Sequence, residues 1–309
     1  MDTLVTPAPR LLRSYFELGK LKIVELWLGF FVGVSLLAPA DRGSPRALAV
    51  LGLILVAGIA VIALTCSLDD IAGVRDGVDQ ANHREGARWG VAKPILDGRL
   101  RESQAWRFSS LLAAIALAGS SAALALAWPL PLWLVGVMAF QMACAVNYSY
   151  GLKLSYHGAG ELVILVGGAG TVLLPYALVA RHAPAVVWAS ALLVGAWHAQ
   201  VVMCSNSKDA AGDRATGRRT IAARTSPRGN RRYVAAAFAV VWASAGAALV
   251  FGPLPRVHAL VLVPVFVAQA LQLRRGVGQG RWLGARLVGF RVLRYGILGL
   301  SLANLSVTR

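Results

Sequence analysis

Nine apolar stretches follow one another along the chain, and polar segments separate them. Each has about 17 to 23 residues, close to the roughly 20 that a helix needs to cross the hydrocarbon core of a bilayer. The pattern predicts a polytopic all-α membrane protein, a nine-transmembrane-helix bundle forming a single domain over residues 1–309, with residues 1–15 as a flexible N-terminus. The nine ranges are 21–39, 47–67, 106–128, 130–148, 160–180, 185–206, 233–251, 257–273 and 287–307.

Basic residues are spread unevenly over the polar segments. Of the 31 Lys and Arg residues, 24 fall in segments on one side of the predicted membrane and 5 on the other. Positive charge gathers on the cytoplasmic side of membrane proteins, so the N-terminus is predicted inside and the C-terminus outside. The net charge of +17 would by itself suit nucleic acid, but its alternation along the chain indicates a lipid bilayer as partner and no nucleic acid.

The composition agrees with a membrane location. Apolar residues make up 57% of the chain, mean hydropathy is +0.62, and 15% of residues are charged, against about 25% in soluble domains. Three widely spaced cysteines in apolar stretches indicate packing residues and not a disulfide framework or a zinc site. Richness in Ala and Arg favours a bacterial source, and hence the bacterial inner membrane as the location.

Four carboxylates gather in the segment SLDDIAGVRDGVD at 67–79, directly after the second apolar stretch. They are Asp69, Asp70, Asp76 and Asp79. Such a cluster repels itself unless a cation neutralises it, and carboxylate oxygens are ligands that Mg²⁺ prefers. Gly73 and Gly77 let backbone or ligand approach closely. The alternative interpretation is a solvated helix end, with Arg75 and Arg84 as counter-ions.

The next polar segment is basic. Arg84, Arg88, Lys93 and Arg99 offer donors to diphosphate oxygens. Basic cytoplasmic segments are also the default in membrane proteins, so this segment alone is a weak signal.

A second acidic stretch, NSKDAAGDRATGRRT at 206–220, follows the sixth apolar stretch. Asn206, Asp209 and Asp213 are spaced i, i+3 and i+7, which places them on one helical face, with Lys208 beside them and Arg218 after them. Both acidic stretches begin where an even-numbered helix leaves the predicted membrane, so they lie on its cytoplasmic face. Two such clusters suit two Mg²⁺ ions that clamp one diphosphate and stabilise charge on it as it leaves.

Several other polar residues have two interpretations. Asn147, Tyr148 and Tyr150 end the fourth apolar stretch, where tyrosine rings either steady a carbocation or anchor the helix at the interface. Glu161 begins the fifth stretch, where we favour a pocket role over helix capping. For His198 we favour a hydrogen-bonded structural role over a place in the pocket.

Two charged side chains lie inside the last apolar stretch, Arg291 and Arg294. Charges within a membrane-spanning segment often mark function. Both arginines are within two helical turns of the inner end, so we favour snorkelling to the interface.

These motifs resemble the UbiA superfamily of intramembrane prenyltransferases, which carry two Asp-rich motifs on a nine-helix bundle. The second motif and the segment YSYGLKLSYHGAGEL at 148–162 resemble the menaquinone-pathway branch, the 1,4-dihydroxy-2-naphthoate polyprenyltransferases, and KPILDGRL at 93–100 is similar to a superfamily motif. The first motif departs from the family pattern. Asp69 stands where Asn is usual and Gly73 replaces an Asp, for which the additional Asp76 is expected to compensate.

The resemblance implies Mg²⁺-dependent transfer of an isoprenyl group from an isoprenyl diphosphate to a small-molecule acceptor, an aromatic or quinone precursor. The catalytic, metal-binding set that it implies is Asp70, Asp76, Asp79, Asp209 and Asp213, with Asp69 as a further metal and substrate ligand. The remaining implied substrate-binding residues are Arg75, Arg88, Lys93, Asn147, Tyr148, Tyr150, Lys153, Glu161, His198, Asn206, Lys208 and Arg218.

Two alternatives predict different behaviour. A UbiA-type terpene cyclase would ionise the same diphosphate and close rings without an acceptor. A transporter would have polar groups at the membrane centre in an inverted repeat. The acidic groups here gather on one face, and the two halves of the chain look like a parallel repeat, which disfavours a transporter.

Overall fold

The structure, a computed structural model, describes residues 8–83 and 92–307. Every regular element in these ranges is helical, as the hydrophobic pattern predicts. Eight long helices correspond to eight of the nine apolar stretches. They are α4 (Pro45–Arg75), α6 (Glu102–Ala127), α7 (Leu132–Asn147), α8 (Gly160–Ala180), α9 (Ala185–Ala215), α11 (Pro227–Val250), α12 (Ala259–Leu273) and α13 (Trp282–Val307).

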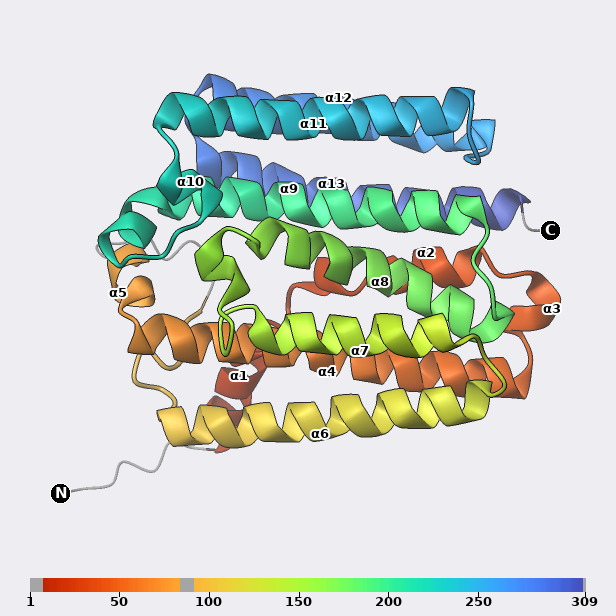
Figure 1. Ribbon diagram of the computed structural model, residues 1–309, viewed down its shortest axis with the longest axis horizontal. Helices are drawn as coiled ribbons and strands as arrows, with labels where there is room; N and C mark the ends of the chain where they lie inside the picture. The colour runs from red at the N-terminus through yellow and green to blue at the C-terminus, as the bar shows by residue number, and fades with distance from the viewer. Residues whose placement is uncertain (1–7, 84–91, 308–309) are drawn as a thin grey trace.

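The helices run nearly parallel or antiparallel to one another in a flattened bundle (Figure 1). Among the described residues, six helices are long and apolar enough to cross a membrane, and α7 is a shorter apolar helix. The count of nine spans and the orientation remain predictions. The largest buried cluster joins α2 (Gly29–Ser35), α4, α8, α9 and α13, and its large side chains include Trp197, Leu293 and Ile297.

The first apolar stretch is not the continuous helix predicted over 21–39. It forms a short 3₁₀ helix, η1 (Val24–Leu26), then α2 and the single turn α3 (Pro39–Arg42). The close packing of α2 against α8 explains part of this difference. A Cβ atom on Gly29 would lie 2.0 Å from Oγ1 of Thr171, and one on Gly33 would lie 2.3 Å from the carbonyl oxygen of Val172. The glycines that permit this contact also weaken a helix.

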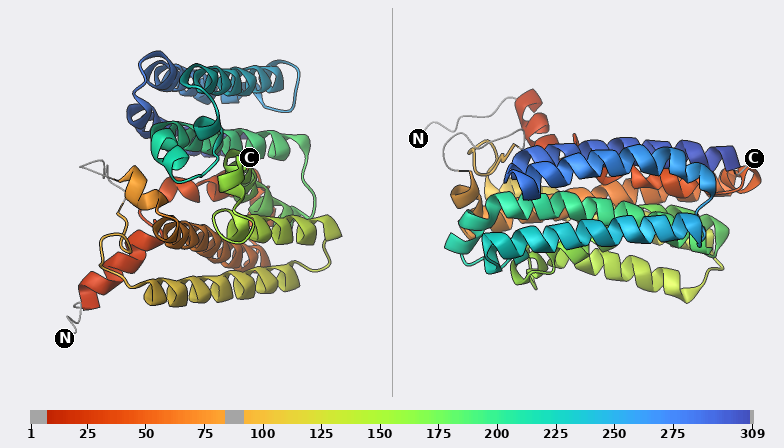
Figure 2. Two further views of the ribbon diagram at one scale, coloured as in Figure 1. Left: turned by 60° about the vertical axis from the view of Figure 1, so that its left-hand side comes forward. Right: turned by 90° about the horizontal axis from the view of Figure 1, so that it is seen from above.

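An additional helix, α1 (Ala8–Leu18), precedes the first apolar stretch. Part of it lies in the predicted flexible N-terminus, of which residues 1–7 are outside the described residues. Leu18 is fully buried against Ile71 of α4 and Ala105 of α6. Figure 2 shows α1 projecting obliquely from the bundle at the end where α4 finishes.

The helices that carry the acidic stretches extend past their apolar parts. Each of α4 and α9 has 31 residues, about 46 Å at 1.5 Å per residue, which exceeds a hydrocarbon core of about 30 Å. Ser44 caps the start of α4 by accepting a hydrogen bond from the backbone nitrogen of Ala47, and Gly77, with φ of 75°, separates α4 from α5 (Val78–Asn82). The polar ends of both helices therefore meet at one end of the bundle, near α5 and α10 (Ile221–Arg224) (Figure 1).

Candidate functional site

The two acidic stretches lie face to face, because α5 packs against the end of α9. Asn82 of α5 donates a hydrogen bond of 2.9 Å from Nδ2 to Oδ1 of Asp213. Its own amide oxygen fits against Gly212, where a Cβ atom would lie only 2.0 Å away. Sequence separation gives no hint of this contact, which joins residues 131 positions apart.

Two lysines face the first acidic stretch. Lys93 Nζ lies 2.8 Å from Oδ1 of Asp70 and 2.9 Å from Oδ1 of Asp79. Lys20 Nζ lies 3.1 Å from the same oxygen of Asp70 and 3.8 Å from Oδ2 of Asp69. Lys93 is a predicted site residue, whereas Lys20 is one that the sequence did not single out. It lies 50 positions from Asp70, directly before the first apolar stretch.

Burial and neighbouring charges act in opposite directions on the pKa values of Lys93, Lys20 and Asp79. Burial acts to lower the pKa of Lys93, but the charge of Asp70, with that of Asp79, outweighs it, and the pKa lies above its ordinary value. The pKa of Lys20 is raised in the same way, against burial, mainly by Asp70. Burial raises the pKa of Asp79, although Lys93 acts in the opposite direction. Both lysines are therefore cations at neutral pH.

Gly73 has a specific role at this site. A Cβ atom on Gly73 would lie 2.7 to 2.8 Å from the carboxylate atoms of Asp79, so the Asp79 carboxylate fills the space of a side chain at position 73. Asp79 therefore places a carboxylate beside position 73. Asp76 faces Lys153, at 2.6 Å between Nζ and Oδ2. The expected compensation by Asp76 remains a prediction.

The second acidic stretch has one enclosed and one accessible carboxylate. Asp213 is fully buried and accepts hydrogen bonds from Asn82 and from the Thr220 hydroxyl, while Arg218 Nη1 lies 4.0 Å from its Oδ1. Asp209 is 22% exposed and pairs with Lys208 at 3.0 Å. Asp209 is therefore the carboxylate of this stretch that is open to a ligand.

A hydroxyl bridge links the two stretches. Ser149 donates a 2.6 Å hydrogen bond to Oδ1 of Asp69 and lies 3.2 Å from the hydroxyl of Ser155. Arg218 donates to the same Ser155 hydroxyl at 3.2 Å, and its guanidinium lies 5.0 Å from the ring centre of Tyr156. Ser149, Ser155 and Tyr156 are in the 148–162 segment but were not singled out from the sequence.

Four further predicted residues that the structure describes make the following contacts. Tyr148 is buried beside Cys144 and Val163. Tyr150 is 40% exposed and packs on Trp106, and Asn147 bonds only to Ala143 and Leu152, so these two do not join the acidic cluster. Arg75 pairs with Glu102. Arg88 lies outside the described residues.

Glu161 is a buried carboxylate at the start of α8. Asn206 Nδ2 donates a 2.9 Å hydrogen bond to its Oε1, and its Oε2 has no hydrogen-bond partner in the described part of the chain. Asn206 precedes Asp209 by three residues, so Glu161 is linked to the second acidic stretch.

His198 has both of its predicted roles. Its ring nitrogens lie 2.9 Å from the carbonyl oxygen of Val194 and 3.0 Å from that of Glu25, and the ring also lines an internal cavity. Glu25 in turn accepts a 2.8 Å hydrogen bond from Nε of Arg294. Arg294 therefore forms an ion pair with Glu25 while half of its side chain is exposed, and its snorkelling to the interface remains a prediction.

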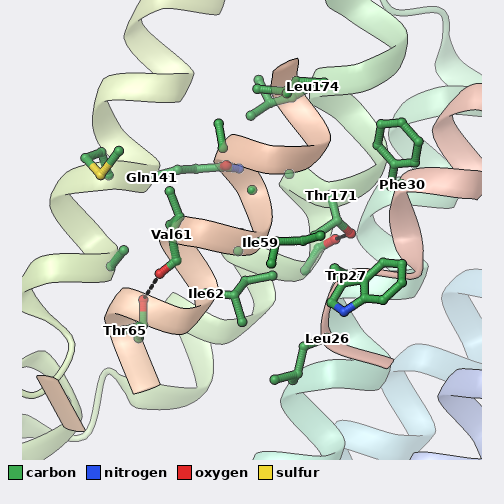
Figure 3. Close-up of a pocket in the computed structure, with 18 of the residues that line it drawn as sticks. Leu26, Trp27, Phe30, Ile59, Val61, Ile62, Thr65, Gln141, Thr171 and Leu174 are labelled. Atoms are coloured by element: carbon green, nitrogen blue, oxygen red, sulfur yellow. Dashed lines mark hydrogen bonds between the residues drawn. The ribbon is translucent and has the colours of Figure 1, made fainter. Parts of the chain in front are cut away.

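An apolar cavity of about 190 Å³ begins at Cys66, directly before the first acidic stretch and three residues, about one helical turn, before Asp69. Cys66 of α4 lines its upper part, and Ile54, Met138 and Leu174 line its deeper part. Trp27 and Phe30 close one side of it (Figure 3). Lysines and carboxylates able to bind a metal, next to the end of an apolar cavity, suit a molecule with an anionic head and a hydrocarbon tail.

The buried carboxylates of Asp70 and Asp79 fit a divalent metal ion on the condition that Lys93 moves. Asp70 Oδ2 and Asp79 Oδ2 are buried oxygens without a hydrogen-bond partner in residues 8–83 and 92–307, and carboxylate oxygens are Mg²⁺ ligands. Within those residues, no group of three His, Cys, Asp or Glu side chains is close enough to hold a metal as it stands. Lys93 lies between Asp70 and Asp79, so it must move when a metal binds there.

The model of one protein family, described as the UbiA prenyltransferase family, matches residues 26–286. The chain belongs to this family. It is accordingly a membrane prenyltransferase. No curated protein matches the sequence significantly.

Solved structures of UbiA homologues have the same fold. The apo structure of a homologue from Aeropyrum pernix K1 matches with a TM-score of 0.67 and 18% identity, covering 92% of this chain and 98% of the other. A homologue from Archaeoglobus fulgidus bound to DMAPP and Mg²⁺ matches with a TM-score of 0.62 and 13% identity, covering 95% and 99%. A digeranylgeranylglyceryl phosphate synthase matches with a TM-score of 0.63 and 12% identity, covering 96% and 99%. These matches confirm the prediction of an all-α, UbiA-like fold.

Proposed function

We propose that this UbiA-family protein transfers an isoprenyl group from an isoprenyl diphosphate to an aromatic or quinone-precursor acceptor, with Mg²⁺ as cofactor. The observation that carries the proposal is the apolar cavity that ends at Cys66, three residues before the first of the carboxylates, with Asn82 of α5 joining the first acidic stretch to Asp213 of the second. The Archaeoglobus fulgidus homologue bound to DMAPP and Mg²⁺ supports the donor class and the metal.

The metal ligands proposed are Asp69, Asp70, Asp76, Asp79, Asp209 and Asp213. Bound Mg²⁺ supplies Lewis-acid stabilisation of the negative charge on the diphosphate. Lys20, Lys93 and Arg218 provide donors for phosphate oxygens, because each lies beside a proposed metal ligand, the two lysines beside Asp70 and Arg218 beside Asp213. The C–O bond to the diphosphate breaks with its electron pair going to oxygen, an acceptor carbon bonds to the isoprenyl carbon, and the acceptor loses a proton.

The chain also orients the two substrates and excludes water from the reacting carbon. The apolar cavity holds the isoprenoid chain and keeps water away from the electron-poor carbon. The unpartnered oxygen of Glu161 offers an acceptor hydroxyl a hydrogen bond beside Asn206. The similarity of the 148–162 and 206–220 segments to the menaquinone-pathway branch favours 1,4-dihydroxy-2-naphthoate as acceptor. The nine spans, an inside N-terminus and a bacterial inner-membrane location belong to the same proposal.

Product analysis tests this proposal. Purified protein in detergent would receive Mg²⁺ and C10, C15 or C20 allylic diphosphates, with and without 1,4-dihydroxy-2-naphthoate or 4-hydroxybenzoate. We expect a prenylated aromatic that is absent from the Asp209→Ala variant. A cyclised hydrocarbon formed without any acceptor would replace the transferase proposal by the cyclase alternative. A folded protein that releases no diphosphate from any donor would refute both.

A further inference from the structure

Gln141 places an amide in the wall of a cavity whose lining is mostly apolar, with hydroxyl groups of Thr65, Ser120 and Thr171 and the ring of His198 as its other polar members. Figure 3 shows its side chain among the residues that line the cavity. Its Nε2 donates a 3.2 Å hydrogen bond to the carbonyl oxygen of Val166 on α8. A Cβ atom on Gly170 would lie 1.7 Å from Nε2 and 2.3 Å from Cδ and Oε1 of Gln141. The amide therefore occupies the space that the absent side chain of Gly170 leaves.

The amide lies part-way down the cavity. On α8 the lining runs from Val163 to Pro175, about 18 Å at 1.5 Å per residue. Val166 and Gly170, which hold the amide, are three and seven residues below Val163, about 5 to 10 Å along that path. The deeper cavity beyond them is lined by Ile54, Met138 and other apolar side chains. A hydrocarbon chain entering from the end at Cys66 meets Gln141 before it reaches this deeper part.

We propose that Gln141, held by Gly170, determines the length of the isoprenoid chain that the cavity accepts. The inference rests on the proposed function, because it assigns the cavity to the donor's hydrocarbon tail. A chain that ends above the amide leaves its hydrogen bond intact. A longer chain must displace the amide or lie against its polar atoms, and burying an amide without a hydrogen bond is unfavourable. The native protein therefore discriminates against the longer donors.

Substitutions of Gln141 and of Gly170 should change the ratio of C20 to C10 donor use in opposite directions, which gives a test. Gln141→Ala removes the amide, so the ratio of C20 to C10 donor use should rise about ten-fold or more. Gly170→Ala adds a methyl group where the amide lies and forces the amide off α8, so the same ratio should fall. In the Gln141→Ala/Gly170→Ala double variant the methyl group meets no amide, and the ratio should return to near that of Gln141→Ala.

Gly136→Ala is the matched control. It adds a methyl group to α7 at an exposed position with no atom within 4 Å of the new Cβ, and should leave the ratio unchanged. Thermal unfolding of each variant would verify that it is folded. An unchanged C20 to C10 ratio in both Gln141→Ala and Gly170→Ala would overturn the inference.

Binding separates this inference from the proposed function. Stabilisation by C10 and C20 S-thiolodiphosphates, which resist loss of the diphosphate, reports chain-length preference without turnover. Wild-type protein that binds these analogues with the expected changes in the variants, yet transfers no isoprenyl group, would refute the proposed transferase activity and retain the inference. Wild-type protein that binds neither analogue would refute both.

Discussion

The ammonium group of Lys93 lies 2.8 Å from Oδ1 of Asp70, in a buried ion pair one helical turn beyond Cys66, where the cavity ends. The same ammonium group reaches Asp79 of α5 at 2.9 Å, so one cation ties the end of α4 to α5. In this arrangement the lysine balances the charge of carboxylates that we propose as metal ligands. Lysine and metal therefore compete for the same oxygens.

Replacing Lys93 by methionine should destabilise the protein in the absence of metal. The change leaves two buried carboxylates without their shared cation, which costs about 3 kcal/mol. Addition of Mg²⁺ should recover part of that loss. Thermal unfolding with EDTA and with Mg²⁺ measures both effects.

Lys153→Met is the control for this prediction. It breaks an ion pair whose side chains are 39% and 29% exposed, which should cost less than about 1 kcal/mol. Equal losses in the two lysine variants would contradict the distinction between the buried pair and the surface pair.

Gly73→Ala should impair the site without disturbing the bundle. The new methyl group overlaps the Asp79 carboxylate and pushes it from its place beside Lys93. Because the displaced group is a proposed metal ligand, we expect Mg²⁺ affinity and product formation to fall by about 10- to 100-fold. Titration of product formation with Mg²⁺ measures this. Gly52→Ala, on α4 with no atom within 4 Å of the new Cβ, should match wild type.

The pair of Glu25 and Arg294 predicts a second stability effect inside the bundle. Arg294→Met leaves the Glu25 side chain, which is 4% exposed, as an unpaired buried charge. Since the arginine is half-exposed, we expect a loss of about 2 to 3 kcal/mol in the free energy of unfolding. Chemical unfolding in detergent measures it.

Two variants control this measurement. Arg291→Met changes the exposed arginine three residues earlier on α13 and should cost less than about 1 kcal/mol. The double variant Glu25→Gln/Arg294→Met removes both charges and should be more stable than Arg294→Met alone. If the double variant is the less stable of the two, the charge of Glu25 is not the cause.

A pH dependence is expected where α1 is tied to the segment before α6. A hydrogen bond from Arg99 holds the pKa of Glu17 below its ordinary value of 4.5. A lowered carboxyl pKa stabilises the fold above pH 4.5, and that contribution disappears as the pH falls through the lowered value. Wild type should therefore exceed Glu17→Gln in stability at neutral pH, with a difference that shrinks in acid. A difference that is constant with pH would refute this.

The hydrophobic pattern was sufficient for much of the fold. Eight of the nine predicted stretches are helices, because an apolar run of this length has few alternatives to a helix in a membrane. Two of them, α4 and α9, end eight and nine residues past the predicted bounds. The first stretch departs from the pattern. There, Glu25 is held by Arg294, 269 residues away, and Gly29 and Gly33 pack against α8.

The residues of the site also divide into those that the sequence identified and those that only the tertiary structure revealed. The sequence by itself determined the family, the two acidic stretches and Lys93, because these are local motifs with characteristic spacing. Only the tertiary structure brought in Lys20, placed Asp79 in the space of Gly73, and turned Asp76 towards Lys153. Helical periodicity relates residues three to seven positions apart. Contacts between residues 50 to 269 positions apart depend instead on how the helices pack and on where the absence of a side chain leaves room for another.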